Sequence, residues 1–504
     1  MSVKPVVIIG AGIAGLTAAA LLAHEGVPVT LVEAHHQAGG CAGTFCRGPY
    51  VFDVGATQVA GLGPGGIHDR LFRHLDIASP SAEILDPCCL VDLLDGYPPI
   101  NLWHDPKRWK EERQRHFPGT EKFWSLCHLL HKSNWAFVQR DPVLPMRNLW
   151  DFRQFLNALG PFNLASGLVS MLSVEDLLRM TAAQHDHRLK KFLDLQLKLY
   201  SQEPADRTAA LYGATVLQMA HAPLGLWHLD GSMQKLSDVL TSYLKAMGVH
   251  MLFKHKVISL KKNNHSFDKW RVQIIDSKGK FMTLNSCDVV CTLPPQSLFD
   301  LLPLNLYGST EYQKKLAELP QPSGAVVFYG ALNREELPSD CPGHIQLAVE
   351  DPGPLFVSIS KDEDGRAPRG QATLIASLFS QTSLWSNLDN SEYQIQKTIM
   401  LDMILRELEK WFGLKPNNWL HKELATPRSF AKWTGRPNGI VGGLGQHPRI
   451  FGPFGLSSRT PLSGLWLCGD SIYPGEGTAA VSQSALMACK QLMNERGLAI
   501  NILS

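Results

Sequence analysis

The clearest succession of apolar and polar segments lies at the start of the chain. A short apolar run, Val6 to Ile9, is followed at once by the glycine-rich segment Gly10 to Gly15. An alanine- and leucine-rich segment then reaches Gly26. This order predicts a buried strand, a tight turn and a helix. A second apolar run, Val27 to Val32, ends in Glu33 and predicts the next strand.

The spacing of the glycines indicates what this turn does. In a dinucleotide-binding unit, Gly10 makes the turn, Gly12 lets the backbone approach a pyrophosphate, and Gly15 lets the helix pack against the strand. The free N–H groups and positive end of the helix then face the phosphates. Glu33 is placed to accept hydrogen bonds from both ribose hydroxyls of an adenosine. The alternative is a strand, turn and helix without a ligand, and Glu33 favours the dinucleotide.

Two further segments, 39–45 and 50–57, are dense in glycine. Such glycines either make loops or return the backbone close to something large and flat. Because the first motif lies so near, we favour a ligand that Gly39 and Gly40 approach.

Later segments alternate between helical and strand patterns. Residues 79–229 read as mixed helices and loops. Strands are then predicted at 249–253, 257–260 and 288–293, with a hairpin at 270–275 and 281–284. These strands indicate that the chain returns to the first domain. In the block 296–423, strands at 326–329, 344–349 and 372–378 and an amphipathic helix at 392–412 suit one sheet that covers a cavity.

The C-terminal motif repeats the order of the first one. An apolar run from Gly464 leads to Gly469-Asp470, a glycine loop that includes Gly477 and Thr478 follows, and a helix is predicted at 481–493. The start of that helix presents N–H donors and a positive dipole to an electron-rich group. Asp470 is placed to hold a polyol hydroxyl.

Two such sites at opposite ends of the chain need one ligand long enough to touch both. FAD fits, with its ribose on Glu33, its pyrophosphate on Gly10 to Gly15 (Ala14 included), its ribityl chain near Asp470 and its flavin against 476–480. A helix N-terminus beside the flavin would stabilise the anionic reduced ring. NAD would leave the C-terminal motif unexplained.

One helical stripe in the first mixed block has two interpretations. Leu149, Phe152, Phe155, Leu156 and Leu159 recur at helical spacing, which predicts a helix that faces the core. The alternative is a surface helix that dips into a membrane interface, flanked by Arg147 and Arg153.

Composition limits the class of protein. The 504 residues suggest two intimately connected domains, and a net charge of +2 argues against a nucleic-acid partner. No apolar run approaches the ~20 residues of a spanning helix. The first strand begins too close to Met1 for a signal peptide, so we expect a protein that is not secreted. The ten cysteines form no CxxC pair, and the histidine pairs lack further ligands, so no metal site is predicted.

Several of these motifs resemble the bacterial-type phytoene desaturase and carotenoid isomerase family of flavoproteins. The N-terminal fingerprint, Gly39-Gly40, the segment Phe52 to Gly55 and the stretch Gly469 to Thr478 carry the likeness. Within the family, the segments 40–45 and 55–62 look most like the cyanobacterial C-3',4' carotenoid desaturases. The resemblance covers both ends of the chain strongly and the middle in outline.

The resemblance implies FAD and a long acyclic carotenoid as substrate, with 1-hydroxylated carotenoids included. It also implies a peripheral position on the membrane that supplies the carotenoid. Carried over by position, Glu33 is the ribose ligand, Val257 a backbone contact to the adenine and Asp470 the ribityl contact. Many family members carry Arg where this chain has Cys41, so the phosphate contact of that Arg is absent or replaced. The membrane would be the cell or thylakoid membrane, on its cytoplasmic side, and a quinone or oxygen would reoxidise the flavin.

The chemistry that this family implies is removal of a hydride to flavin and of a proton from the neighbouring carbon. Isomerisation on the same scaffold needs reduced flavin and no net transfer. Because a polyene offers no polar handle, an apolar tunnel beside the flavin must supply most of the catalysis. Glu476 is the only acidic residue embedded in the C-terminal flavin motif, but we favour a simple fit to the helix dipole and leave the catalytic residue open.

The sequence therefore predicts an α/β protein with a Rossmann-type FAD-binding domain, of the amine oxidase and carotenoid desaturase kind, and an interleaved mixed α+β substrate domain. The FAD-binding domain takes residues 1–78, 230–295 and 424–504, and the substrate domain takes 79–229 and 296–423. The predicted reaction is C-3',4' desaturation. The alternatives are a prolycopene-type isomerase, a flavin amine oxidase and a lipid-carrying escort protein without flavin, which the intact glycines and Glu33 argue against.

Overall fold

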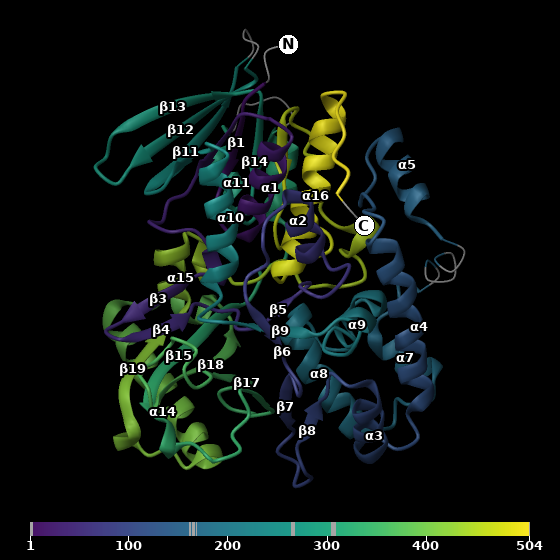
Figure 1. The fold of residues 1–504 in the computed structure, drawn as a ribbon, viewed down its shortest axis with the longest axis vertical. Coiled ribbons are helices and arrows are strands. Elements are labelled where there is room, and N and C mark those ends of the chain that lie inside the picture. Colours follow the sequence, from purple (N-terminus) through teal and green to yellow (C-terminus); the bar gives the residue numbers. More distant parts are fainter. Residues whose placement is uncertain are drawn as a thin grey trace.

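A parallel five-stranded sheet lies in the upper half of the molecule as drawn in Figure 1. The computed structural model describes residues 4–502 apart from 161–162, 164–166, 168, 264–267 and 304–308. The order of strands in the sheet is β10 (His250–Leu252), β2 (Val29–Val32), β1 (Val6–Ile9), β14 (Asp288–Cys291) and β20 (Leu465–Leu467). The predicted return of the chain to the first sheet is confirmed, because β10 and β14 pair in parallel with β2 and β1.

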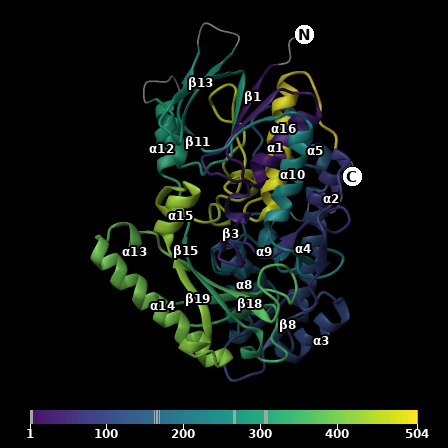
Figure 2. The same cartoon turned by 60° about the vertical axis from the view of Figure 1, so that its left-hand side comes forward.

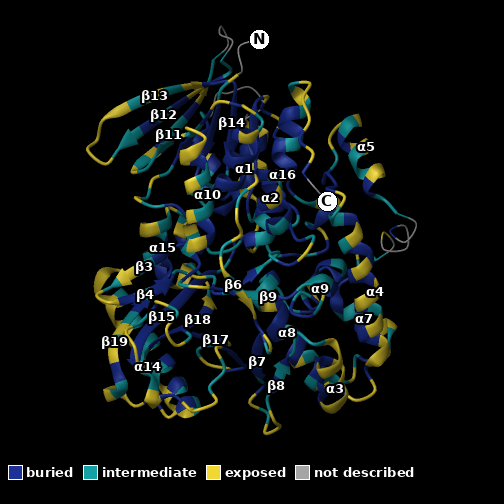
Figure 3. Cartoon of the chain, viewed as in Figure 1, coloured by how far each residue is buried: buried dark blue, intermediate teal, exposed yellow. Residues whose placement is uncertain are grey.

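The alternating side chains of β1 explain why both faces of this sheet are covered. Val6 and Ile8 pack with helices α1 (Ile13–His24), α10 (Gln234–Ala246), α16 (Thr478–Glu495) and α2 (Ile67–Leu75). Val7 and Ile9 face the antiparallel sheet of β11 (His255–Lys262), β12 (Trp270–Asp276) and β13 (Phe281–Ser286). All four residues of β1 are buried, as Figure 3 shows for the centre of the sheet. The chain thus forms the predicted α/β layer structure.

A seven-stranded mixed sheet forms the lower half. Its order is β19 (Trp419–Ala425), β15 (Gly324–Asn333), β18 (Gln371–Ser380), β17 (Leu355–Ile359), β16 (His344–Leu347), β7 (Cys89–Asp92) and β8 (Ile100–Leu102). Helix α14 (Asn390–Phe412) lies along its outer side (Figure 2) and buries Ile404, Leu408 and Phe412 against it. The single sheet predicted for this block is present. Its strands β7 and β8, which come from before residue 103, were not predicted, because the pairing of β7 with β16 joins residues far apart in sequence.

Helices packed on aromatic side chains complete the lower half. They are α3 (Pro106–His116), α4 (Glu121–Val138), α7 (Val174–Met180), α8 (His187–Ser201) and α9 (Ala210–Val216). A small sheet of β5 (Val59–Ala60), β9 (Leu226–Leu229) and β6 (Ala82–Ile84) lies between these helices and the upper half. The hairpin of β3 (Thr44–Arg47) and β4 (Tyr50–Asp53) and the helix α15 (Pro427–Thr434) lie above the large sheet in Figure 1.

The remaining helices are short and lie at the surface or between layers. They are α5 (Leu149–Ala158), α11 (Ser297–Leu301), α12 (Ser309–Ala317) and α13 (Ser383–Ser386). The five strands of the parallel sheet all fall inside the three segments assigned from sequence to the cofactor domain. The domain boundaries themselves stay a prediction.

The stripe expected to face the core does so only in part. Phe155 and Leu159 are partly buried against the core, but Leu149 is 87% exposed, Phe152 46% and Leu156 47%. The core-facing interpretation is therefore wrong for three of the five residues of the stripe. Spacing alone missed this because α5 stands at the edge of the molecule (Figure 1), where only one side of it meets other elements. Among the described helices, none is long and apolar enough to span a membrane.

Candidate functional site: two turns at the edge of the parallel sheet

The first turn is built so tightly that two of its glycines admit no side chain. Gly10 has φ +100°, and a Cβ built on it would lie 2.5 Å from Oγ1 of Thr292. A Cβ on Gly15 would lie 1.9 Å from the carbonyl oxygen of Gly10. Helix α1 therefore packs directly on the turn, in the manner expected for the first and third glycines of the motif.

Gly12 differs because the space beside it is open. Its φ of −69° suits any residue, and no atom lies within 4 Å of a Cβ built there. Gly12 is the N-cap of α1, and no side chain caps the helix at this point. The first N–H groups of α1, with Ala14 in its first turn, thus border open space, as a pyrophosphate requires.

Glu33 lies at the end of β2 with both carboxylate oxygens engaged by backbone. Oε2 accepts from the N–H of Ala11 at 2.6 Å, and Oε1 accepts from the N–H of His35 at 2.7 Å. Burial raises the pKa of Glu33, and these hydrogen bonds oppose the rise. The N–H of His255 donates to the carbonyl of Glu33 at 2.9 Å, which brings the start of β11 and the buried Val257 to the same edge.

The second glycine pair meets the first turn. The N–H of Gly39 donates to the carbonyl of Ala11 at 2.9 Å. Gly39 and Gly40 have φ of +120° and +58°, and a Cβ on Gly40 would lie 3.4 Å from Cα of Gly12. The backbone at Gly39 and Gly40 does make a close approach, as the sequence indicates, and what it approaches is the first glycine turn.

The C-terminal turn lies beside the N-terminal one, and Thr292 joins them. Oγ1 of Thr292 donates to the carbonyl of Ile9 at 2.8 Å, and a Cβ on Gly469 would lie 3.4 Å from the carbonyl oxygen of Thr292. The N–H of Gly469 donates to Oγ of Ser484 on α16 at 3.0 Å. Sequence reasoning missed Thr292. Its position could have indicated its role, because Thr292 directly follows β14, the strand between β1 and β20. The carboxyl ends of these parallel strands meet at one edge of the sheet.

Helix α16 begins as α1 does. Its N-cap, Gly477, has φ +95°, no side chain caps it, and no atom lies within 4 Å of a Cβ built on it. Thr478 opens the helix and is buried. Two helix N-termini with uncapped N–H groups and open space beside them therefore lie at one edge of the sheet. The residues present fit FAD, a ligand with an acidic pyrophosphate and an electron-rich ring system.

Asp470 is held by an arginine that sequence reasoning missed. Nη2 of Arg436 donates to Oδ2 of Asp470 at 2.7 Å, and Nε donates to the carbonyl of Ile440 at 2.8 Å. Both side chains are mostly buried. The guanidinium also lies close enough to Cys41 to lower the pKa of its thiol, although burial raises that pKa more. Cys41, at the position where an arginine is absent, thus has Arg436 as a cationic neighbour. In the sequence, Arg436 stands between Gly435 and Pro437, which is typical of a turn.

Glu476 lies at the same turn with a carboxyl group removed from water. Its Oε2 accepts from Nε2 of Gln202 at 2.9 Å and from the N–H of Gly443 at 3.3 Å. Burial raises the pKa of Glu476 to about 8. Gln202 follows the end of α8 and was not predicted from sequence.

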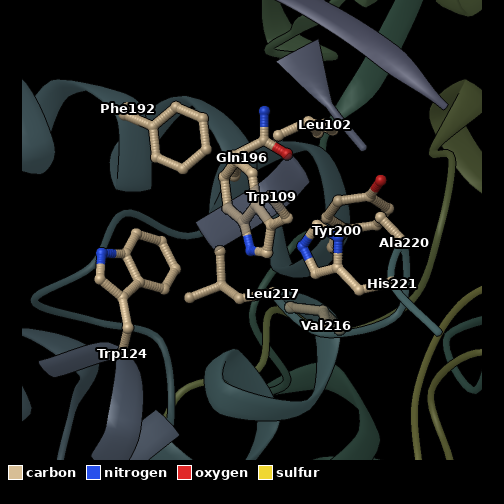
Figure 4. A pocket seen from close by; sticks show the side chains of 10 residues that line it. All are labelled: Leu102, Trp109, Trp124, Phe192, Gln196, Tyr200, Val216, Leu217, Ala220 and His221. Atoms are coloured by element: carbon tan, nitrogen blue, oxygen red, sulfur yellow. The ribbon is translucent and has the colours of Figure 1, made fainter. Parts of the chain in front are cut away.

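Helix α8 leads from this turn to an aromatic cavity in the lower half (Figure 4). Phe192, Gln196 and Tyr200 lie on one face of α8 and line it. The other lining residues come from β8, α3, α4 and the end of α9: Leu102, Trp109, Trp124, Val216, Leu217, Ala220 and His221.

No acidic or basic charge lines this cavity. The ring of His221 stacks on Trp109 with centroids 4.6 Å apart, and its Nδ1 lies 2.6 Å from the carbonyl of Trp103. Burial lowers the pKa of His221 to about 3, so the ring is neutral. A second narrow cavity on the other side of residues 216–225 is lined by Gly61, Gly63, Gly66, Trp135, Met219, Leu224 and Gly225.

The histidine pairs noted in the sequence gather no further ligands in the described part of the chain. The rings of His35 and His36 contact each other in a tilted arrangement, with centroids 4.1 Å apart. Nowhere among the described residues do three His, Cys, Asp or Glu side chains come together as a metal ion would require.

Comparison with known proteins places this site in context. Residues 8–75 match the family model of the NAD(P)-binding Rossmann-like domain. The chain is 26% identical to prolycopene isomerase 1, chloroplastic, of an Oncidium hybrid cultivar, over 98% of this chain and 84% of that protein. It is 22% identical to the phytoene desaturase of Neurospora crassa, over 98% and 85% of the two chains. A solved structure of a double mutant of putrescine oxidase matches with a TM-score of 0.64 at 16% identity, covering 98% of this chain and 99% of that one.

These findings confirm three predictions. The relatives are carotenoid desaturases and isomerases, as the motifs at both ends of the chain indicate. The fold is the Rossmann-type α/β fold that this chain shares with amine oxidases. The Rossmann-like match, these relatives and the paired turns together indicate FAD as the cofactor.

Proposed function

We propose that this chain, a relative of the carotenoid desaturases and isomerases, is an FAD-dependent desaturase that introduces a carbon–carbon double bond into an acyclic carotenoid at the 3',4' position. The segments 40–45 and 55–62, which look most like C-3',4' desaturases, both border the paired turns. Gly40 approaches Gly12, and a Cβ on Gly61 would lie 3.1 Å from Cβ of Ala479 on α16. Of the two segments with the most specific likeness, 40–45 thus borders the proposed pyrophosphate site and 55–62 the proposed flavin site.

The two turns divide the cofactor between them in this proposal. Glu33 and the backbone at Val257 would hold the adenosine, and the glycine turn with Gly10, Gly12, Ala14, Gly15, Gly39 and Gly40 would hold the pyrophosphate. Gly469, Asp470, Gly477 and Thr478 would hold the ribityl chain and the flavin. FAD, when bound, supplies two-electron oxidation of a C–H bond.

The observation that carries the substrate class is the uncharged aromatic cavity at the far end of α8. From Phe192 to Tyr200 the helix covers about 12 Å, and Gln202 then contacts Glu476 at the flavin turn. The cavity as it stands has room for little more than a water molecule, so a polyene that lay along this helix would have to part the side chains of Trp109, Trp124 and Phe192 to place one end among them. Such a site binds by burial of apolar surface and orients a molecule that offers no polar handle.

The substrate would reach this site from a membrane on which α5 docks. Leu149, Phe152 and Leu156 are spaced so that one exposed face of α5 carries all three, and Arg147 and Arg153 beside them are exposed. Apolar side chains that enter the interface and cations that meet anionic headgroups fit a peripheral protein.

Cosedimentation with vesicles tests this docking. We expect wild-type protein to bind phosphatidylcholine vesicles that contain about 30% of the anionic lipid phosphatidylglycerol. The triple variant Leu149→Ser, Phe152→Ser and Leu156→Ser should lose most of this binding. The control variant Leu420→Ser removes an equally exposed apolar side chain elsewhere and should bind as wild type does. Equal binding by all three proteins would contradict the docking role of α5.

A carotenoid cis–trans isomerase is the second candidate, because prolycopene isomerases are among the relatives that span almost the whole chain. This reaction would need the same apolar site and reduced FAD, with no net loss of hydrogen. The flavin amine oxidase alternative has only the shared fold in its favour.

Product analysis separates these candidates. The FAD-loaded protein is incubated with vesicles that contain an acyclic carotenoid, a 1-hydroxylated one or a poly-cis one, with a quinone as electron acceptor. Chromatography with mass detection should show loss of two hydrogens and a red-shifted spectrum. An unchanged mass with a new retention time would establish the isomerase instead. No product with any substrate would contradict both.

A further inference from the structure

Glu476 differs from the other acidic residues of the site because one of its oxygens has no partner. Glu33 uses both carboxylate oxygens to accept backbone N–H groups, and Asp470 is paired with Arg436. In Glu476 only Oε2 is engaged. Within the described part of the chain, Oε1 is buried without any hydrogen-bond partner. A buried carboxyl oxygen without a partner is costly and is retained where a ligand or a reaction uses it.

The surroundings fix the position of this carboxyl group. A Cβ on Gly442 would lie 2.0 Å from Oε2, so only glycine lets the loop close on it. Gln202, which donates to Oε2, is itself held because its Oε1 accepts from the N–H of Ser323 at 2.9 Å. Two segments far apart in sequence, at Gln202 and at Gly443, thus converge on one carboxyl oxygen and leave the other available.

Glu476 also lies between the proposed flavin and the proposed polyene. It directly precedes Gly477, the N-cap of α16, and it contacts the residue that follows α8. The hydroxyl of Tyr212 donates to the carbonyl of Tyr200, a lining residue of the aromatic cavity, at 2.5 Å. Tyr212 is close enough for its own pKa to be raised by Glu476. The carboxyl group therefore lies beside the flavin turn, and Gln202 links it to the end of α8, whose Tyr200 lines the aromatic cavity.

We propose that Glu476 is the base that accepts the proton during desaturation. This inference rests on the proposed function. Bound FAD would supply the two-electron oxidation, taking the hydrogen of one C–H bond of the carotenoid with both electrons of that bond. The C–H bond on the neighbouring carbon breaks as well, its electron pair becomes the second bond of the new C=C, and its proton goes to Oε1 of Glu476. A base positioned in this way contributes 10²- to 10⁴-fold to a rate.

The groups around Glu476 set the pH at which it serves. Burial and the neighbouring Asp470 raise its pKa, while Gln202, the N–H of Gly443 and Arg436 lower it, with a result of about 8. Tyr212, the titratable group that faces it from α9, stays neutral because burial raises its pKa. A base must be ionised, so desaturation should speed up as the pH rises through about 8. An isomerisation that used the protonated acid would slow down over the same range.

Glu476→Gln tests the proposal because glutamine keeps an oxygen that accepts from Gln202 and Gly443 but cannot take up a proton. We expect FAD content equal to wild type and desaturation reduced at least 100-fold. Glu476→Asp should keep a smaller, pH-dependent activity. The matched control is Glu203→Gln, which removes an acidic side chain next to Gln202 that is paired with Arg207 at the surface. It should keep wild-type activity.

Infrared titration of the FAD-loaded protein without carotenoid gives a readout that does not depend on turnover. Wild type and Glu203→Gln should show the carbonyl stretch of a protonated carboxyl group that disappears as the pH is raised through about 8, and Glu476→Gln should lack this band. Equal desaturation by wild type and Glu476→Gln, or a titration that persists in Glu476→Gln, would overturn the proposal. If wild type itself removes no hydrogens, the proposed function fails instead, and the infrared titration still decides whether Glu476 titrates.

Discussion

The N-termini of α1 and α16 are alike in backbone and unlike in their side chains. Both helices begin after a glycine N-cap without a side-chain cap, beside open space, at the same edge of the parallel sheet. Around α1, the side chains at the turn bond to backbone groups: the carboxylate of Glu33 accepts from two backbone N–H groups, and Oγ1 of Thr292 donates to the carbonyl of Ile9. Around α16, Arg436 pairs with Asp470, and both lie close enough to Glu476 to shift the pKa of its carboxyl group.

This difference separates binding from chemistry. Backbone N–H groups do not titrate and hold a phosphate at any pH, which suits the end of a cofactor that takes no part in the reaction. Side chains that exchange protons belong at the reacting end. The comparison therefore predicts that changes at α1 affect stability or cofactor retention alone, while changes at α16 affect the reaction as well.

The largest effect should come from Gly15→Ala, which breaks the backbone turn. Its Cβ would meet the carbonyl oxygen of Gly10 at 1.9 Å, so α1 must move. We expect a loss of about 3 kcal/mol in the free energy of unfolding, the upper end for overpacking. The matched variant Gly12→Ala meets no atom within 4 Å and should cost less than about 1 kcal/mol, yet lower FAD affinity at least tenfold. Melting curves and FAD titration measure both, and equal stability of the two variants would break the comparison.

Arg436→Ala should cost almost as much at the other turn. It leaves the mostly buried carboxylate of Asp470 without its cation, and removal of one partner of a buried pair costs about 3 kcal/mol. FAD retention should fall with it. Arg436→Lys should recover part of the stability but not the bonds to the loop carbonyls. A wild-type melting temperature for Arg436→Ala would show that Asp470 does not need this pair.

The stability of the folded protein should depend on pH through Glu476. Its pKa is about 8 in the folded chain and 4.5 in the unfolded chain, so between these values the folded state holds a proton that the unfolded state has lost. Stability should therefore fall as the pH rises from about 5 to 8, by a few kcal/mol. In Glu476→Gln this part of the pH dependence should vanish. A steeper slope in the variant than in wild type would contradict the buried, protonated state of Glu476.

Glu33→Ala should have a smaller and more selective effect. It removes the carboxylate that would hold the ribose, so FAD affinity should fall at least tenfold, which corresponds to about 1.4 kcal/mol. Because only the backbone N–H groups of Ala11 and His35 lose a hydrogen-bond partner, the fold should persist. Glu25→Ala, a change at a partly exposed acid on the same domain, is the control. Wild-type flavin content in Glu33→Ala would remove Glu33 from the cofactor site.

The sequence predicts more of this site near α1 than near α16, for a physical reason. The first turn is made by consecutive residues whose roles follow from spacing, so Gly10, Gly12, Gly15 and Glu33 can be read directly. The second turn is completed by Arg436 and Gln202, which reach it only through tertiary packing. The strands β7 and β8 escaped prediction for the same reason, since they depend on which neighbours the fold provides. For α5 the sequence offers a surface helix as the alternative to a core-facing one, and only the packing of the fold decides between them.

A crystal structure of the FAD-loaded protein tests the central claim most directly. The account predicts one FAD per chain, with the adenosine at Glu33, the pyrophosphate at the N-terminus of α1 and the flavin at the N-terminus of α16, beside Glu476. A cofactor that reached only the turn at α1, or a flavin with its ring away from α16, would contradict the assignment of binding to one turn and chemistry to the other.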